Sequence, residues 1–437
     1  MTTTPVATSA SRSSGVTAPS ARRDLRARRQ VLTTSVMGLA LLVVVLHAVV
    51  GILPDAPVVW VLTPDRLVLL LGLAAGLVAA PSPREWATWL DLPIVLLVAA
   101  SAASAVASGQ GWPVWRALLT GVMTCYLAVG LMRRHPSSWT LVTGSALVAC
   151  AVTGLTALHQ WADDVPTGFC RAGLAAGREL CSDPDAMVRV TGTFGNPNVL
   201  AAALVLLLPV AWAGATSLPT SSARLVGYAV VVLGYVAVLL TWSRAGVAAA
   251  VVGATVLVVL RPGWSRRVST AVAAAVVIGG VLVVGGSLGV RRDVWGAALR
   301  VVAGHPLGVG PGRSGAVIDQ QVPGPERFRH AHDLWLSWTV EGGWLAGAAV
   351  VALTLGAVWL VRRGVRSGST VARVAGAGLA GFAVMSLVDH PANTTGIATL
   401  MWLLLGLVAG VRDVGGRDVG VREAGARDSR SPAPPRP

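Results

Sequence analysis

Two histidines separated by one residue, His330 and His332, stand in a polar stretch of the chain, with Asp333 directly after them. A neutral imidazole accepts a proton near neutral pH, which makes either histidine a candidate general base. On a helix the two side chains would diverge by about 200°, so they would share a metal ion only on extended backbone. A single histidine more often has a structural role, but arginines surround this pair. We therefore favour proton transfer and predict no metal site.

Arginine is concentrated in the same polar stretch, between residues 291 and 342. The arginines there are Arg291, Arg292, Arg300, Arg313, Arg327 and Arg329. A guanidinium group matches the oxygen geometry of phosphate, so the cluster predicts a polyanionic ligand. Residues 291–300 have the pattern of an interfacial amphipathic helix, and a glycine-rich loop follows at 305–312. This loop lacks the spacing of a nucleotide-binding phosphate loop and no strand precedes it, which argues against a nucleotide.

Arg244 lies in the sequence Thr-Trp-Ser-Arg-Ala-Gly, residues 241–246, which separates two apolar runs almost without a loop. Arg244 must therefore lie at or within the boundary of a membrane. An arginine there is costly unless it is paired or solvated, which makes it a functional candidate. The alternative is an arginine that extends from the end of a helix to reach water.

The segment 192–198, Gly-Thr-Phe-Gly-Asn-Pro-Asn, stands just before another apolar run. Backbone N–H groups at the start of a helix can bind an anion, so Asn196 and Asn198 are candidate binding residues. An N-cap turn formed by the same residues is an equally good interpretation.

Cys170 and Cys181 have ten residues between them, a spacing that suits a disulfide in an oxidising compartment. Cys125 and Cys150 fall inside apolar runs and are expected to be inert. No C-x-x-C or clustered Cys/His spacing indicates zinc. The pair Asp183 and Asp185 has the D-x-D spacing that some glycosyltransferases use to hold a cation, although a turn is the more common role for such a pair next to proline.

The elements that must position these residues are membrane helices. Hydrophobic residues make up 54% of the 437 residues and charged residues only 13%, which does not allow a water-soluble surface. Several apolar blocks reach the about 20 residues that cross a bilayer. The predicted spans are 31–53, 67–80, 92–108, 114–132, 139–158, 198–217, 225–243, 245–260, 269–290, 343–361, 372–389 and 396–411. The fold class is therefore all-α and polytopic, with about twelve transmembrane helices.

Alternating these spans from a cytoplasmic N-terminus places most arginine-rich short loops inside, in agreement with the positive-inside rule. The net charge of +15 follows from these loops, so it does not indicate nucleic acid. Both termini are then cytoplasmic, and residues 1–30 and 412–437 are predicted to be disordered tails around a membrane domain at 31–411. Loops 159–197 and 291–342 lie outside. The second loop carries arginines on the side that the rule disfavours, and a phosphate-bearing ligand would explain them.

Taken in order, the segment 192–198, Ser243-Arg244-Ala-Gly246, Arg292 to Trp295, 305–310 and His330 to Leu334 with Glu341-Gly342 resemble the O-antigen ligase and Wzy-type polymerase superfamily. The resemblance covers about residues 190–350. It implies a membrane-embedded glycosyltransferase of the C-type architecture that is independent of metal and needs no cofactor. The chain has Asp333 where members usually have Asn, Ser or Gln, and Ala346-Gly347 where Gly-x-x-Gly is common.

The resemblance further implies that Arg244, Arg291 and Arg292 bind the donor and that His332 is the base, and the chemistry of the transfer suggests the remaining roles. Arg244, Arg291 and Arg292 would bind the diphosphate of a polyprenyl diphosphate-linked glycan, with Arg300 beside them. His332 would deprotonate the hydroxyl of a glycan, lipid or protein acceptor, and Asp333 or Glu341 would orient it. We expect a single displacement with inversion at the outer face of the cytoplasmic membrane. The alternative function is a transporter or flippase, which would show internal repeats and polar residues near the bilayer midplane.

Overall fold

The computed structural model describes most of the chain between residues 18 and 411. Outside the described residues lie 1–17, 55, 172–178, 184, 262–264, 266, 268–270, 273, 276–277, 280–290, 323–329 and 412–437. The predicted tail 412–437 and most of the predicted span 269–290 therefore cannot be compared with the structure, and the same holds for Arg327 and Arg329.

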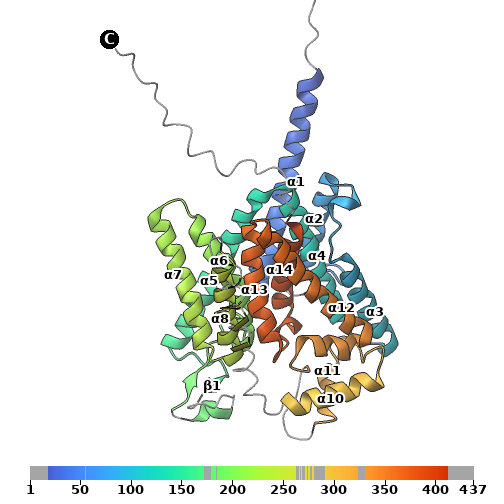
Figure 1. Cartoon of the computed structure of the whole chain (residues 1–437), viewed down its shortest axis with the longest axis vertical. Helices are drawn as coiled ribbons and strands as arrows, with labels where there is room; N and C mark the ends of the chain where they lie inside the picture. The colour runs from blue at the N-terminus through green and yellow to red at the C-terminus, as the bar shows by residue number, and fades with distance from the viewer. Residues whose placement is uncertain are drawn as a thin grey trace, which may run out of the picture.

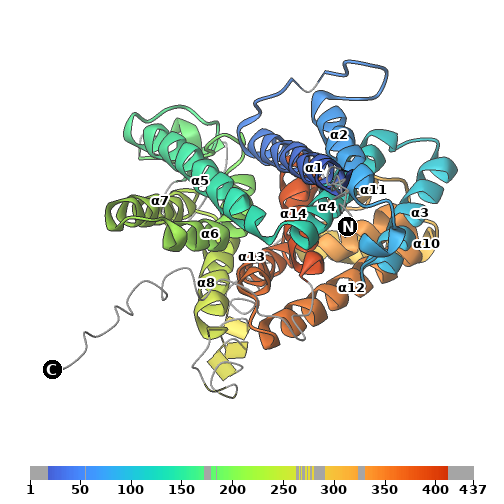
Figure 2. The ribbon, with the colours of Figure 1, turned by 90° about the horizontal axis from the view of Figure 1, so that it is seen from above.

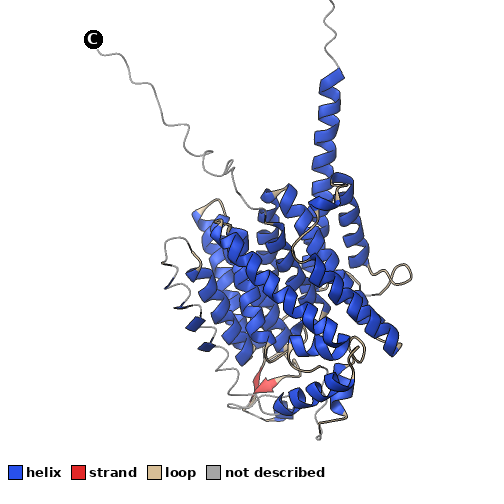
Figure 3. Cartoon of the chain, turned by 45° about the vertical axis from the view of Figure 1, so that its right-hand side comes forward, coloured by secondary structure: helices blue, strands red, loops and turns tan. Residues whose placement is uncertain are grey.

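Helices dominate the described part of the chain (Figures 1 and 3). They are α1 (Ala18–Val50), α2 (Pro64–Ala79), α3 (Asp91–Ser108), α4 (Trp112–Arg134), α5 (Trp139–Ala162), α6 (Pro197–Ser217), α7 (Ser221–Leu240), α8 (Arg244–Val259), α10 (Arg291–Gly304), α11 (Ser314–Asp319), α12 (Leu334–Arg366), α13 (Thr370–Ser386) and α14 (Thr395–Gly410). Short 3₁₀ turns lie at Pro83–Glu85, Pro136–Ser138, Glu179–Ser182 and Pro391–Asn393. The strands β1 (Cys170–Arg171) and β2 (Met187–Val188) pair antiparallel, with Cys170 opposite Val188.

Seven described helices are long and apolar enough to cross a membrane, namely α1, α3, α4, α5, α6, α7 and α12. Shorter apolar helices are α8, α13 and α14. These findings confirm a helical, multi-pass membrane protein. Each predicted span other than 269–290 overlaps one described helix, but the count of twelve spans stays a prediction.

The helices pack side by side around α6, α13 and α14 (Figure 2). Helix α14 packs against α4, and α13 packs against α8. Along α6 nearly every side chain is buried, as at Leu200, Leu204 and Leu208. This buried centre fixes the ends of the surrounding helices relative to one another.

The two ends of the bundle differ. The N-terminal part of α1 projects from one end, whereas the β1–β2 hairpin, α10 and α11 lie at the other (Figure 1). The connections after α5, α7 and α13 reach the hairpin end, and so does the start of α12. The polar residues of these connections therefore meet at one end of the bundle.

Several helix boundaries differ from the predicted ones, among them the starts of α1 and α12 and the end of α13. Helix α1 begins at Ala18 instead of residue 31, because residues 18–30 are rich in the good helix formers Ala, Arg and Leu. Helix α12 begins at Leu334, inside the predicted loop 291–342, because the Asp333 side chain accepts from the Leu336 N–H at 2.7 Å and caps it. Helix α13 ends at Ser386, whereas the predicted span extended to residue 389. Asp389 therefore lies beyond the end of the helix.

Helix α12 breaks at Gly343, where φ is 75° and ψ is −173°. The glycine-rich loop packs its backbone against this break: Val309 N–H donates to Val340 C=O at 2.9 Å, and Trp344 N–H donates to Pro306 C=O at 3.1 Å. A Cβ atom on Gly308 would lie 2.4 Å from the Glu341 carbonyl oxygen. The glycines of residues 305–312 therefore serve a close backbone contact, and they fix where α12 bends.

Candidate functional site

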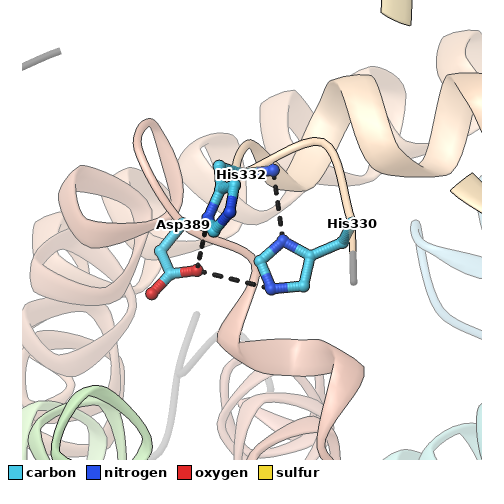
Figure 4. Close-up of side chains that lie close together, drawn as sticks. All are labelled: His330, His332 and Asp389. Atoms are coloured by element: carbon cyan, nitrogen blue, oxygen red, sulfur yellow. Dashed lines mark hydrogen bonds and ion pairs between the residues drawn. The ribbon is translucent and has the colours of Figure 1, made fainter. Parts of the chain in front are cut away.

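His330, His332 and Asp389 converge at the hairpin end of the bundle (Figure 4). His332 Nδ1 lies 3.5 Å from Asp389 Oδ1, and His330 Nε2 lies 3.6 Å from the same oxygen. The histidines precede α12 and the aspartate follows α13, so the packing of α12 against α13 brings the three side chains together. A carboxylate beside an imidazole stabilises the protonated ring, which is what a general base needs.

Residues 330–332 are not helical, which is why the two histidines do not diverge. His332 has a φ of 52°, a left-handed conformation that is uncommon for residues other than glycine. Its N–H donates to His330 Nδ1 at 3.1 Å, and the two rings stack edge to face with centroids 4.5 Å apart. His330 thus holds the backbone turn that aims His332 at Asp389.

A hydrogen bond at His330 and the contact of His332 with Asp389 indicate which ring nitrogens carry protons. Because His330 Nδ1 accepts from a backbone N–H, a neutral His330 carries its proton on Nε2, which faces Asp389. A proton on His332 Nδ1 likewise faces Asp389, and this arrangement makes Nε2 the basic atom of His332. The pair His332 and Asp389 therefore has the geometry of a base with its orienting carboxylate.

The charges in this cluster are set by burial and by neighbouring rings. Burial by itself would raise the pKa of the Asp389 carboxyl, but the His332 hydrogen bond and the charges of His330 and His332 lower the pKa to about 2. Burial, together with the charge of His330, lowers the pKa of the neighbouring His390 to about 3. At neutral pH the cluster thus contains a carboxylate and a neutral His390.

A polar cavity of about 570 Å³ opens onto these residues. Its lining comes from the hairpin, the start of α6, the turn before α12 and the connection after α13. The lining residues are Phe169, Phe194, Gly195, Asn196, Asn198, Val199, His330, His332, Asp389, His390, Pro391, Asn393 and Thr394. The volume of this cavity lies in the range of small-molecule binding sites in proteins.

Asn196 and Asn198 fit both interpretations of the segment 192–198. Asn196 caps α6, because its side chain accepts from the Asn198 N–H at 2.8 Å, and it also lines the cavity. Asn198 donates from Nδ2 to Asp389 Oδ2 at 3.4 Å. Asn196 therefore caps α6, and Asn198 contacts the second oxygen of the Asp389 carboxylate.

Arg189 extends this polar network and was not predicted from the sequence. Its Nε donates to the Thr241 carbonyl at 2.9 Å, and its guanidinium donates to Asn198 Oδ1 at 3.4 Å. Burial and the neighbouring Arg171 lower the pKa of Arg189. Hydrogen bonds thus connect the turn that precedes Arg244 to Asp389. The adjacent cap at Asn196 was the one sequence signal for this region.

Arg244 is the first residue of α8 and is exposed. The side chain of Ser243 accepts from the Gly246 N–H at 3.2 Å and caps the helix. Arg244 lines a second cavity of about 760 Å³ between the facing ends of α7 and α8, together with Trp242 and Arg171. The structure therefore places Arg244 at the hairpin end of the bundle, one turn of chain away from the Arg189 network.

The arginines of α10 do not line either cavity. Helix α10 buries Val294, Ala297, Ala298, Val301 and Val302 against its neighbours, in keeping with the predicted amphipathic helix. Arg292 and Arg300 are exposed and Arg291 is partly buried. The apolar face of α10 packs inward, so its arginines point outward at the same end of the bundle as His332.

Neither Asp333 nor Glu341 takes the orienting role that we expected. Asp333 caps α12, and burial raises the pKa of its carboxyl to about 6. Glu341 is buried and accepts from the Ser314 hydroxyl at 2.6 Å, so it ties α12 to the start of α11. Glu341 faces Ser314, whereas the carboxylate beside His332 is that of Asp389, which follows a different helix.

His330, His332 and Asp389 also resemble a set of metal ligands, since one ligand atom from each lies within 4.8 Å of the others. Two imidazoles and a carboxylate suit Zn²⁺ and related ions. Our prediction of no metal site assumed that the histidines diverge, and that premise was wrong because residues 330–332 are not helical. The same three side chains therefore fit two kinds of chemistry, which an experiment must separate.

The cysteines and the D-x-D pair do not line the polar cavity. Cys170 and Cys181 form a disulfide, and Cys125 and Cys150 are buried thiols. The Asp183 carboxylate accepts from the Asp185 N–H at 3.0 Å, which is a turn of the kind expected for these residues.

Residues 229–351 match the family model of the O-antigen ligase domain, Wzy_C. The matched segment contains Arg244, α10, the glycine loop, His330 and His332, and it ends before Asp389. No curated protein matches the chain.

Proposed function

The match to the O-antigen ligase domain supports membership of the chain in the O-antigen ligase and Wzy-type polymerase superfamily, and on this basis we propose a specific reaction. The protein transfers a glycan from a polyprenyl diphosphate carrier to an acceptor hydroxyl. The observation that carries this proposal is the pair of His332 and Asp389 at a polar cavity, joined by hydrogen bonds to the turn that precedes Arg244.

The proposed reaction is a single displacement at the anomeric carbon of the donor. The acceptor oxygen forms the new bond to that carbon, the bond to the phosphate oxygen breaks, and the diphosphate leaves as an anion. His332 Nε2 takes the hydroxyl proton, and Asp389 stabilises the imidazolium. Because no covalent intermediate is needed, the product has inverted configuration.

Arginine supports the departure of the leaving group. Negative charge grows on the diphosphate in the transition state, and guanidinium groups that are already in place stabilise it. We assign this role to Arg244. We also assign it to Arg291, Arg292 and Arg300, because α10 lies at the same end of the bundle as His332. These cations supply the charge stabilisation that a metal ion provides in other glycosyltransferases, so we propose a reaction that is independent of metal.

We place the reaction at the outer face of the cytoplasmic membrane, with both termini in the cytoplasm. A disulfide in the hairpin suits an oxidising compartment. Arg133 and Arg134 at the end of α4 and Arg363 in the last turn of α12 belong to the opposite end of the bundle, as the positive-inside rule requires of a cytoplasmic face. The acceptor is a glycan, a lipid or a protein.

The test replaces His332 and Arg244 by alanine in a strain that lacks the native gene. The expected result is loss of polymer and accumulation of the lipid-linked glycan at normal protein level. His159→Ala is the matched control, because His159 is an exposed histidine at the end of α5, away from the cavity. Normal amounts of polymer in both the His332→Ala and the Arg244→Ala strain would refute the proposed enzymatic function.

The side of the membrane on which the lipid-linked glycan accumulates separates this function from that of a flippase. A transferase defect leaves the glycan on the outer face, where an added glycosidase or lectin reaches it in intact cells. A flippase defect leaves it on the inner face, out of reach of either reagent.

A further inference from the structure

The second cavity, beside Arg244, combines an apolar wall with arginine at one end. The wall comes from the facing ends of α7 and α8 and includes Leu239, Leu240, Val247 and Val251. The charged side chains that line it are Arg171 and Arg244. Gly279 also lines the cavity, and Leu239 and Val251 are 55% and 53% exposed, so part of the apolar wall lies at the surface of the bundle. A ligand that fits this cavity has an apolar chain next to an anionic group.

Arg171 reaches this cavity from the disulfide-bonded hairpin. It is the second residue of β1 and directly follows Cys170, whose sulfur is bonded to Cys181. The Arg171 guanidinium lies over the indole ring of Trp242, 4.0 Å from the ring centroid. Stacking on the flat face of an aromatic ring fixes the plane of the guanidinium.

The hairpin is attached to the turn between α7 and α8 at three points. Arg171 stacks on Trp242, the Arg189 side chain donates to the Thr241 carbonyl, and the Val190 N–H donates to the Leu240 carbonyl at 3.3 Å. Cys170 itself is only 7% exposed. The disulfide therefore closes a loop whose first strand carries Arg171.

The hairpin also separates the two cavities. Phe169 lines the polar cavity that contains His332, and Arg171, two positions along the chain, lines the apolar one. A molecule with its lipid chain against α7 and α8 would thus carry its phosphates past Arg171 and Arg244 and its sugar toward His332.

We propose that Arg171 is a phosphate-binding residue for the lipid diphosphate donor and that the Cys170–Cys181 disulfide holds it over the second cavity. A sugar diphosphate diester carries one negative charge on each phosphate, and Arg171 and Arg244 supply one positive charge each. This inference rests on the proposed function, and it makes donor binding dependent on an oxidised hairpin.

The test measures binding of undecaprenyl diphosphate and of uncharged undecaprenol to the detergent-solubilised full chain by native mass spectrometry. Arg171→Ala is expected to weaken binding of the diphosphate about tenfold, as loss of a charge-assisted hydrogen bond does, and to leave undecaprenol binding unchanged. Arg171→Lys should fall between, because it keeps the charge and loses the planar fork. Arg224→Ala is the matched control, since Arg224 is exposed near the far end of α7.

Reduction gives a second, independent arm. Wild-type protein treated with dithiothreitol should lose diphosphate affinity in the same direction as Arg171→Ala, whereas a Cys170→Ser/Cys181→Ser variant should be weak before and after treatment. Thermal unfolding in detergent shows whether the double cysteine variant has folded. If it has not, the wild-type protein reduced with dithiothreitol alone tests the role of the disulfide.

The outcomes separate the inference from the function on which it rests. Equal diphosphate affinity in Arg171→Ala and Arg224→Ala would refute the role of Arg171 and leave the transferase intact. Full affinity after reduction would refute the role of the disulfide. A wild-type protein that binds undecaprenyl diphosphate no more tightly than undecaprenol would contradict the proposed function itself.

Discussion

Replacement of Asp389 by asparagine tests the proposed chemistry most directly. Asparagine has nearly the same shape and can still contact His332 and Asn198, but it cannot carry the negative charge that faces His332 Nδ1 at 3.5 Å. The cavity and the helix ends should therefore persist, while the imidazolium that forms during proton transfer loses its counter-charge.

The expected magnitude follows from that distance. Two full charges 3.5 Å apart interact by about 5 kcal/mol at an effective dielectric constant of about 20. If about half of the proton has moved in the transition state, about 2.5 kcal/mol is lost, and at about 1.4 kcal/mol for each factor of ten the rate falls roughly 60-fold. Asp389 keeps its charge at ordinary pH, since the histidines lower its pKa to about 2 against the effect of burial, so Asp389→Asn removes a full negative charge.

The assay uses the natural donor, extracted from cells that lack the gene, and follows release of polyprenyl diphosphate by purified protein in detergent. Asp293→Asn is the matched control, because Asp293 is an exposed acid on α10. A rate within twofold of wild type for Asp389→Asn, at equal thermal stability, would show that His332 does not work with Asp389.

The remaining predictions concern the metal alternative, the break in α12 and the buried histidine. Dialysis against EDTA should leave transfer unchanged, and a loss that Zn²⁺ restores would instead assign His330, His332 and Asp389 to a metal. Gly343→Ala should destabilise the protein by about 2 kcal/mol or more, seen as a lower unfolding temperature, because φ is 75° and the added Cβ would lie 2.2 Å from the Pro306 oxygen. Gly144→Ala, on α5 with no atom within 4 Å of its added Cβ, should be neutral. Equal effects of the two substitutions would contradict the close backbone contact at Gly343. Burial lowers the pKa of His390 to about 3. Between about pH 6.5 and this value the unfolded chain binds a proton at His390 and the folded chain does not, so the free energy of unfolding should fall as the pH drops. A His390→Gln variant should show a flatter fall in unfolding temperature between about pH 6.5 and 4, and an unchanged slope would count against the buried neutral ring.

The sequence by itself determined the class of the protein and most of its elements. Long apolar blocks have only one stable environment, and a chain in lipid must satisfy its backbone groups within helices. The blocks therefore located the described helices to within a few residues for most spans, as at α3, α6 and α14. The sequence also singled out His332, Arg244 and the cysteine pair, because polar residues are few in such a chain and stand out.

Only the tertiary structure decided which residues act together. Asp389 follows α13, and Asn198 belongs to α6, so neither has a local pattern that points to His332. The position of Asp389 at the outer end of a predicted span was the available signal. The alternation of spans places many residues at the outer face, but it does not predict which of their side chains are in contact. Contacts between side chains depend on the lateral packing of helices, which hydropathy does not encode.

The role of Glu341 shows the same limit in the opposite direction. Its position near His332 in the sequence favoured an orienting role, yet its hydrogen-bond partner in the structure is Ser314 of α11. The backbone turn at His332, with φ of 52°, likewise brings together two histidines that a helix would have kept apart. Local spacing predicts neighbours only while the backbone stays regular, and at this site it does not, because the close packing of glycine backbone and the caps at helix ends decide the direction of each side chain.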